Sequence, residues 1–277
     1  MIKYNEKLYA ERLLTEGFLT KYIAYELKIL VKYFKQEKKI SAKERKILLY
    51  EFCEKYISEF NRVKYFKIIN SALRYGSKGI NKLIVINSIP ITDKEIEYIN
   101  ELEIEEHYKK VLFTLLVKIK LNKELCLQKF NNASKFNFFG GKVELYKEIK
   151  QMSKIPDIYD INIIINELST MGYIDIRNRG RVNLLFIESI EVSKEIVFEI
   201  TNFYNIGYYF DWFNGANGVI KCENEGCEEI VKKTNNNMKY CVNCAKEVKL
   251  EQNKLWKREY DKSRKIENPY NPTPTRV

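Results

Sequence analysis

The chain has 277 residues, of which 45% are hydrophobic and 31% charged, and this composition predicts a folded protein with about two or three small domains. The 48 Lys and Arg residues outnumber the 37 Asp and Glu residues, and the formal net charge of +11 favours phosphate backbones or acidic protein surfaces as partners. A low-GC genome would produce the same excess without any binding role, because Lys, Asn, Ile and Tyr have AT-rich codons. No run of about 18 apolar residues occurs and residues 1–10 are polar, so we expect neither a membrane span nor a secretory signal, and a cytoplasmic protein.

Residues 1–78 are predicted to form a helical domain within a mainly α, α+β protein. Apolar residues recur at helical spacing between Ile23 and Phe34. Ser41 and Glu44 have the spacing of a capping box, which predicts the start of another helix, and a further helix is expected over 62–73. Glycines at 76 and 79 then mark a domain boundary.

Residues 81–200 are predicted to form a second domain. Its expected elements, in chain order, are a strand at 83–86 ended by Pro90, a helix starting at Thr92, a long helix with an apolar stripe from Ile104 to Ile119, a short helix over 145–152, a third helix from Pro156 to Gly172, and a strand at 196–198.

A hairpin is predicted directly after the third helix. Residues 173–177 and 181–186 alternate between apolar and polar, and 178–180 is a turn. Three helices followed by a hairpin are typical of a winged helix, whereas a generic α+β domain with one hairpin is the alternative. The third helix carries carboxylates that would repel phosphate, so nucleic-acid contact is expected through the hairpin tip, at Arg177, Arg179 and Arg181. The alternative is that these arginines are merely solvated.

Residues 201–218 form an aromatic linker segment with seven rings between Phe203 and Phe213. We interpret these rings as a core that joins two small domains. A surface on which unpaired bases stack is the alternative.

Four cysteines are the strongest chemical signal, with the spacing Cys-x4-Cys-x13-Cys-x2-Cys: Cys222, Cys227, Cys241 and Cys244. The intervening residues 228–240 are polar and long enough for a short β-hairpin that returns the second pair to the first. Four thiolates can then surround one Zn²⁺ at about 2.3 Å, and four cysteine ligands leave no open position for water, so the ion would be structural. One or two disulfides are the alternative.

A basic helix is predicted over 246–265, after the zinc ribbon that starts at 219, and a disordered tail over 266–277. The candidate nucleic-acid contacts of this part are Lys232, Lys233, Lys254, Lys257 and Arg258. A solvated helix of mixed charge is the alternative, because acidic residues are interspersed with the basic ones.

Catalysis is not expected. The single histidine, His107, falls on the predicted polar face of a helix and is interpreted as a solvated surface residue. The adjacent carboxylates of Glu105 and Glu106 diverge on a helix, so they do not form a catalytic pair. We therefore predict that the protein is not an enzyme.

A further set of segments recurs in a familiar order: 89–92, 111–116, 168–176 around Met171-Gly172-Tyr173-Ile174, 199–203, 232–234 and 239–246. Through these segments, residues 81–265 resemble a family of poorly characterised proteins from phages and prophages of low-GC Gram-positive bacteria. The resemblance implies a viral accessory protein with a zinc module, acting in the host cytoplasm. One departure concerns the first cysteine pair, which encloses four residues where such ribbons have two.

Two functional hypotheses follow. The first is a zinc-containing, winged-helix nucleic-acid-binding protein that regulates phage transcription or replication. The second is an inhibitor of a host defence system, such as an anti-CRISPR protein, that acts by protein–protein binding. The N-terminal helices and the acidic third helix would then form the docking surface.

Overall fold

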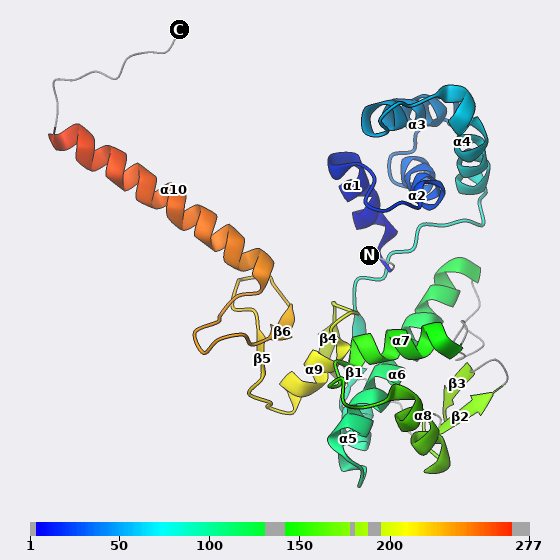
Figure 1. Cartoon of the computed structure of the whole chain (residues 1–277), viewed down its shortest axis with the longest axis vertical. Helices are drawn as coiled ribbons and strands as arrows, with labels where there is room; N and C mark the ends of the chain where they lie inside the picture. The colour runs from blue at the N-terminus through cyan, green and yellow to red at the C-terminus, as the bar shows by residue number, and fades with distance from the viewer. Residues whose placement is uncertain (1–3, 131–141, 178–180, 188–194, 268–277) are drawn as a thin grey trace.

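The computed structural model describes residues 4–130, 142–177, 181–187 and 195–267, and the predicted tail therefore lies almost wholly outside the described residues (Figure 1). The fold is α+β and mainly helical, as predicted. Small antiparallel sheets of two strands each accompany the helices in the described part of the chain. No helix among these residues combines the length and the hydropathy that crossing a bilayer requires.

The N-terminal helices are α1 (Glu6–Glu16), α2 (Ile23–Gln36), α3 (Ala42–Tyr56) and α4 (Arg62–Ser77), with α2 at the centre. Leu27, Leu30 and Val31 of α2 are fully buried. The predicted capping box is confirmed, because Glu44 N–H donates to Ser41 Oγ at 3.3 Å and Ser41 N–H donates to the Glu44 carboxylate at 3.1 Å. These helices therefore enclose a core of their own.

The middle of the chain has a second core, organised around one long helix. Its elements are β1 (Ile89–Thr92), α5 (Asp93–Glu101), α6 (Glu106–Phe130), α7 (Lys142–Ser153), α8 (Ile161–Thr170), β2 (Ile174–Arg177), β3 (Arg181–Leu184) and β4 (Ile196–Ile200). Helix α6 is buried on all sides over 110–119, so it forms the axis on which the other helices pack.

Two boundaries predicted for this region are wrong. Residues 83–86 form no strand of a sheet; they run extended beside the N-terminus, where Ile86 N–H donates to the Tyr4 carbonyl at 2.8 Å. The strand starts at Ile89 and includes Pro90, which is tolerated because a two-stranded sheet has only edge strands. Helix α8 begins at Ile161 and not at Pro156, because the Asp160 carboxylate caps it by accepting from Asn162 N–H at 2.8 Å.

The predicted hairpin after the third helix is confirmed. Strands β2 and β3 pair antiparallel, with Ile174 opposite Leu184 and Arg177 opposite Arg181. The next strand, β4, pairs with β1 in a separate sheet. The order of three helices and a hairpin is therefore present. Within the described residues, β4 does not add a third strand to the β2–β3 hairpin.

The C-terminal part contains α9 (Ile206–Phe213), β5 (Val219–Lys221), β6 (Ile230–Lys232) and α10 (Val242–Glu267). Helix α9 packs against α6 and α7 on one side and against β5 and β6 on the other. Of the predicted aromatic segment, Phe203, Tyr209 and Phe210 are buried in the middle core. Helix α10 projects away from the rest of the molecule (Figure 1).

Candidate metal centre

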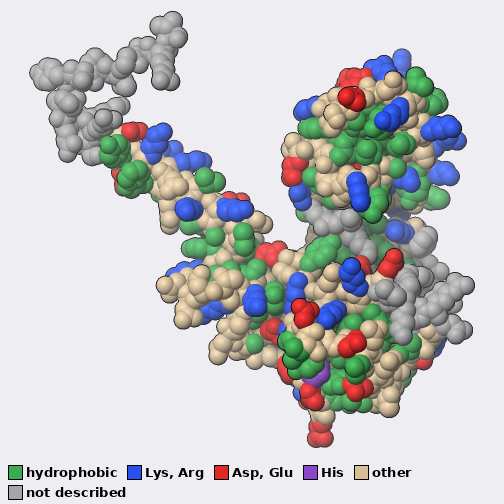
Figure 2. All heavy atoms as spheres, in the orientation of Figure 1, with side chains coloured by type: hydrophobic (Ala, Val, Ile, Leu, Met, Phe, Trp, Pro, Cys, Tyr) green, Lys and Arg blue, Asp and Glu red, His purple; other side chains and the backbone are tan. Residues whose placement is uncertain are grey.

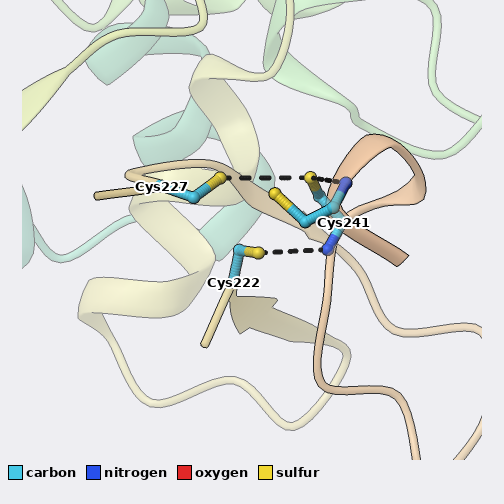
Figure 3. A group of neighbouring side chains, drawn as sticks. Cys222, Cys227 and Cys241 are labelled. Atoms are coloured by element: carbon cyan, nitrogen blue, oxygen red, sulfur yellow. Dashed lines mark hydrogen bonds between the residues drawn. The ribbon is translucent and has the colours of Figure 1, made fainter. Parts of the chain in front are cut away.

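The four cysteine sulfurs meet in one cluster, as the spacing predicts. All four Sγ atoms lie within 4.8 Å of one another, and Cys227 Sγ lies 4.0 Å from Cys241 Sγ. The labelled side chains point toward one another from separate segments of the chain (Figure 3). Three of the four residues are buried, and Cys227 is partly exposed. The cluster can therefore hold a metal ion.

The hairpin that builds the cluster differs from the predicted one. Strand β6 lies within 228–240, but its partner is β5, which precedes the first cysteine. Cys222 directly follows β5 and Cys227 precedes β6, so the hairpin encloses the first cysteine pair. The prediction of a hairpin between the two pairs is therefore wrong. An irregular loop returns the chain to the cluster.

The unusual spacing of the first pair is absorbed by a turn. Cys227 N–H donates to the Asn224 carbonyl at 3.0 Å, which closes the loop between the two cysteines. Gly226 adopts a φ of 77°, a left-handed conformation that suits glycine. The longer loop is thus closed by a turn, and both of its sulfurs reach the cluster.

Backbone N–H groups surround two of the sulfurs. Cys241 N–H lies 3.3 Å from Cys222 Sγ, and Cys244 N–H lies 3.5 Å from Cys241 Sγ. Burial raises the pKa of the Cys222 thiol, but the N–H donors of Cys241 and Asn224, together with the Cys227 and Cys244 side chains, outweigh it, and the resulting pKa is lowered. Donors of this kind stabilise thiolate ligands and fix their orientation.

The donor set and its geometry fit a tetrahedral ion. A tetrahedron with metal–sulfur bonds of about 2.3 Å has edges of about 3.8 Å, close to the 4.0 Å between Cys227 and Cys241. A disulfide requires about 2.05 Å between sulfurs, and all six cysteines are free thiols in the structure. The disulfide alternative is therefore not what this geometry shows.

The cysteine module is joined to the middle core through α9. Val219 and Ile230, one from each strand of the hairpin, are buried in that core. The Tyr209 hydroxyl donates to the Glu228 carbonyl at 3.3 Å, and Asn202 Nδ2 donates to the Glu229 carboxylate at 2.8 Å. The module is thus held from both sides of its hairpin and does not hang on a free linker.

The cluster also forms the N-terminus of α10. Cys241 is the residue before the helix, and its carbonyl accepts the Ala245 N–H at 2.9 Å. Its sulfur takes the place of a capping oxygen, because it lies near Cys244 N–H in the first turn. Two cysteine ligands therefore fix the start of the projecting helix.

The basic residues predicted to contact nucleic acid occupy two separate regions. Lys232 lies on β6 and Lys233 follows it, while Lys254, Lys257 and Arg258 lie on α10 and are exposed. Lys and Arg side chains line this helix (Figure 2).

The β2–β3 hairpin lies on the far side of the body from α10 (Figure 1). Arg177 ends β2, and its Nε donates to the Asp175 carboxylate at 2.7 Å, which partly neutralises it. Arg181 begins β3, and Arg179 lies outside the described residues. The structure therefore does not bring the hairpin and α10 onto one continuous surface.

The interpretation of His107 as a solvated residue is wrong. Its side chain is only 12% exposed, because its ring stacks on Tyr159 at 4.0 Å between centroids. Tyr159 lies in the turn before α8, a segment that was predicted to belong to the helix. Among the described residues, no second group of three or more His, Cys, Asp or Glu side chains has metal-binding geometry.

Comparisons of the chain with protein-family models, with curated proteins and with solved structures return no match.

Proposed function

We propose that the protein binds nucleic acid through α10 and that one structural Zn²⁺ in the cysteine cluster holds this helix in place. Zinc is the ion that four thiolates in a closed tetrahedral site most commonly bind in proteins. Such a site has no open position for a substrate, so its contribution is to fold and orientation. The binding function is then carried by the surface of α10, which the metal holds in position.

One observation carries the proposal. Lys254, Lys257 and Arg258 are exposed on one face of a projecting helix, at positions i, i+3 and i+4. None of them forms an ion pair with any residue that the structure describes. Unpaired cations on an accessible helix are available for phosphate oxygens, and the major groove of DNA is wide enough to admit a helix.

A salt series tests this assignment. The reversal variant Lys254→Glu, Lys257→Glu and Arg258→Glu should weaken binding to duplex DNA. Because each duplex phosphate contact contributes about 0.9 to the slope of log affinity against log salt, the slope should fall by about 2.7. The matched control reverses three exposed lysines on α3 and α4, namely Lys43, Lys46 and Lys67, and so changes the net charge equally. Equal losses in both variants would show that only net charge matters and would contradict a site on α10.

The hairpin is a second proposed contact. Residues 81–200 have the winged-helix order of α6, α7, α8 and hairpin, with Arg177 at the end of β2 and Arg181 at the start of β3. Because this hairpin lies far from α10 (Figure 1), both regions can touch one nucleic acid only if it passes around the body. We propose that α10 provides the principal contact and the hairpin an accessory one. The resemblance to phage and prophage proteins supports a role in regulating phage transcription or replication.

Protein binding to a host factor is the second candidate function, because α10 also exposes large apolar side chains. Leu250, Leu255 and Trp256 are 58%, 55% and 68% exposed. The acidic third helix was predicted to form part of the docking surface, but two carboxylates of that predicted helix already act within the fold. Asp160 caps α8, and Glu167 accepts from the Tyr108 hydroxyl. An inhibitor of host defence would therefore dock through α10, and Leu255→Ser with Trp256→Ala would abolish inhibition in such a case while leaving DNA affinity nearly intact.

A further inference from the structure

A cavity of about 930 Å³ lies between the N-terminal helices and the middle of the molecule. Helices α2 and α4 line one side, α6 and α7 line the other, and the connecting residues 79–84 close one edge. The cavity is remote from the cysteine cluster, and neither α10 nor the β2–β3 hairpin contributes to it. Its volume is that of a small-molecule site and not that of a surface groove for a polymer.

Positive charge predominates in the lining. Five lysines and three glutamates face the cavity: Lys28, Lys32, Lys82, Lys118 and Lys129 with Glu6, Glu144 and Glu148. Lys129 lies close enough to Lys32 to lower the pKa of Lys32 further, beyond the larger effect of burial. Like charges that converge on one cavity are stabilised by an anion between them.

Two of the lysines are buried and held in fixed positions. The Lys32 ammonium pairs with Glu6 and also donates to the Lys82 carbonyl at 3.3 Å, and its side chain is 6% exposed. The Lys118 ammonium donates to Glu148 at 2.6 Å and to the Tyr4 hydroxyl at 3.1 Å, and its side chain is 4% exposed. Burying these charges is costly and each is offset by a carboxylate, so Lys32 and Lys118 form a fixed, charged wall of the cavity.

Aromatic rings lie beside this charge. Tyr25 of α2 is 39% exposed and Tyr75 of α4 is 43% exposed, so both are available to a ligand. The Lys28 ammonium lies 5.0 Å from the centre of the Tyr75 ring. Burial raises the pKa of Tyr25 to about 12, with Glu6 and Tyr75 as the next causes, which shows that these groups are near one another. Planar rings next to cations match a ligand that is itself both planar and anionic.

We infer that this cavity binds a nucleoside phosphate. Lys28 and Lys129 contact the phosphate groups, above the fixed pairs formed by Lys32 and Lys118. The base lies against Tyr25 and Tyr75, since a tyrosine face stacks on any base. A bound nucleotide would bridge α2 and α4 to α6, and so would fasten the N-terminal helices to the middle of the molecule.

Binding measurements with defined probes test the inference. Metal-loaded full-length protein is titrated at low salt with ATP, GTP, CTP and UTP, with inorganic tripolyphosphate and with the uncharged nucleosides. At least one nucleotide should bind saturably at about one per chain, and tripolyphosphate should bind at least about tenfold more weakly because it cannot stack. Nucleosides should not bind detectably. Tripolyphosphate binding as tightly as the nucleotides would contradict the role of the tyrosines.

Variants locate the site. Lys129→Glu and Tyr75→Ala change exposed side chains of the cavity, and each should weaken nucleotide binding about tenfold or more, because each removes one charged or stacking contact. Lys46→Glu on α3 is the matched charge control and should leave the affinity unchanged. Circular dichroism and melting temperature establish that every variant is folded. Absence of saturable binding in the folded protein, or equal losses in the control, would overturn the inference.

The α10 reversal variant separates this site from the proposed function. It should lose DNA binding and keep nucleotide binding, because α10 does not reach the cavity. Loss of both activities in that variant would show that the nucleotide binds on α10 and would contradict the cavity assignment.

Discussion

Cys227 is the most exposed of the four clustered cysteines, and its thiol would have to lose a proton to bind a metal. Burial, together with the neighbouring thiols, raises its pKa to about 12. Near neutral pH the thiol therefore keeps its proton until a metal displaces it.

Metal affinity should consequently rise with pH. A group with a raised pKa must lose its proton on binding, so each unit of added pH favours the complex. Competition with a zinc chelator between about pH 6 and 8 measures the affinity, and calorimetry in buffers of different ionisation enthalpy counts the protons released. An affinity independent of pH over this range would show that the thiols are already ionised.

Gly207 shows how closely α9 approaches its neighbours. A Cβ at this position would lie 1.8 Å from the Ser153 carbonyl oxygen and 2.7 Å from Lys110 Cε. The carbonyl belongs to backbone at the end of α7 and cannot move aside cheaply.

Gly207→Ala should therefore destabilise the protein by about 3 kcal/mol or more. Chemical denaturation measures the loss. Gly218→Ala is the matched control, because nothing lies within 4 Å of a Cβ there. Similar stabilities for the two variants would mean that α9 does not pack as closely as described.

For single residues, the sequence predicted the chemistry of a side chain better than the environment in which that side chain lies. Four cysteines at a characteristic spacing indicate that they lie together, so the cluster could be predicted without knowledge of the fold. His107 could not, because its stacking on Tyr159 depends on a turn between α7 and α8 that no local pattern reveals.

Among the elements, α10 has the least tertiary packing and should depend most on the cysteine cluster. Every residue over 251–262 is exposed, so no tertiary packing supports this part of the helix. Isolated helices are marginally stable in water, and here the cysteine cluster orders the first turn.

Removal of the metal should disorder the module locally. Chelation, or Cys244→Ser, should increase amide exchange over 219–245 and reduce the helical circular dichroism, because structural zinc contributes about 10 kcal/mol to folding. Helix α6 should keep its protection, since its core lies elsewhere. Cys126→Ser, outside the cluster, is the control and should retain one zinc per chain. Unchanged exchange over 219–245 without metal would show that the hairpin folds on packing alone.

The long helices and the β2–β3 hairpin were predictable from the sequence, and the strands β1, β5 and β6 were not. Repeating apolar positions and capping boxes identify α2, α3 and α6 because the pattern extends over several turns. The strands β5 and β6 are three residues each, and β1 contains a proline. Such short strands are determined by a distant partner, which is why the hairpin was assigned to the wrong side of the first cysteine pair.

For the whole molecule, the first few residues join the two cores. Tyr4 packs against Phe203 in the middle core, and Glu6 N–H donates to the Ile84 carbonyl at 2.8 Å. The Glu6 carboxylate also accepts Ile84 N–H at 2.9 Å and pairs with the buried Lys32. These long-range contacts are invisible to sequence patterns, so the arrangement of the two cores could not be predicted.

Glu6→Ala should destabilise the protein by about 3–5 kcal/mol, because it leaves the buried Lys32 without its counter-charge. Thermal and chemical denaturation measure the effect. Glu16→Ala removes an exposed pair with Arg12 on the same helix and should cost less than about 1 kcal/mol. If the two variants lost similar stability, the Glu6–Lys32 pair would be no more important than a surface pair.

The attachment of α10 at a single joint has a mechanical consequence. Its 26 residues span about 39 Å, so a tilt of about 10° at the sulfur cluster would move the far end by about 7 Å. An ion with longer metal–sulfur bonds, such as Cd²⁺, would therefore change the cluster only slightly and yet displace the C-terminal end of α10 by several ångströms. The direction in which α10 extends is therefore determined at the four thiols, far from the surface that the C-terminal end of the helix would contact.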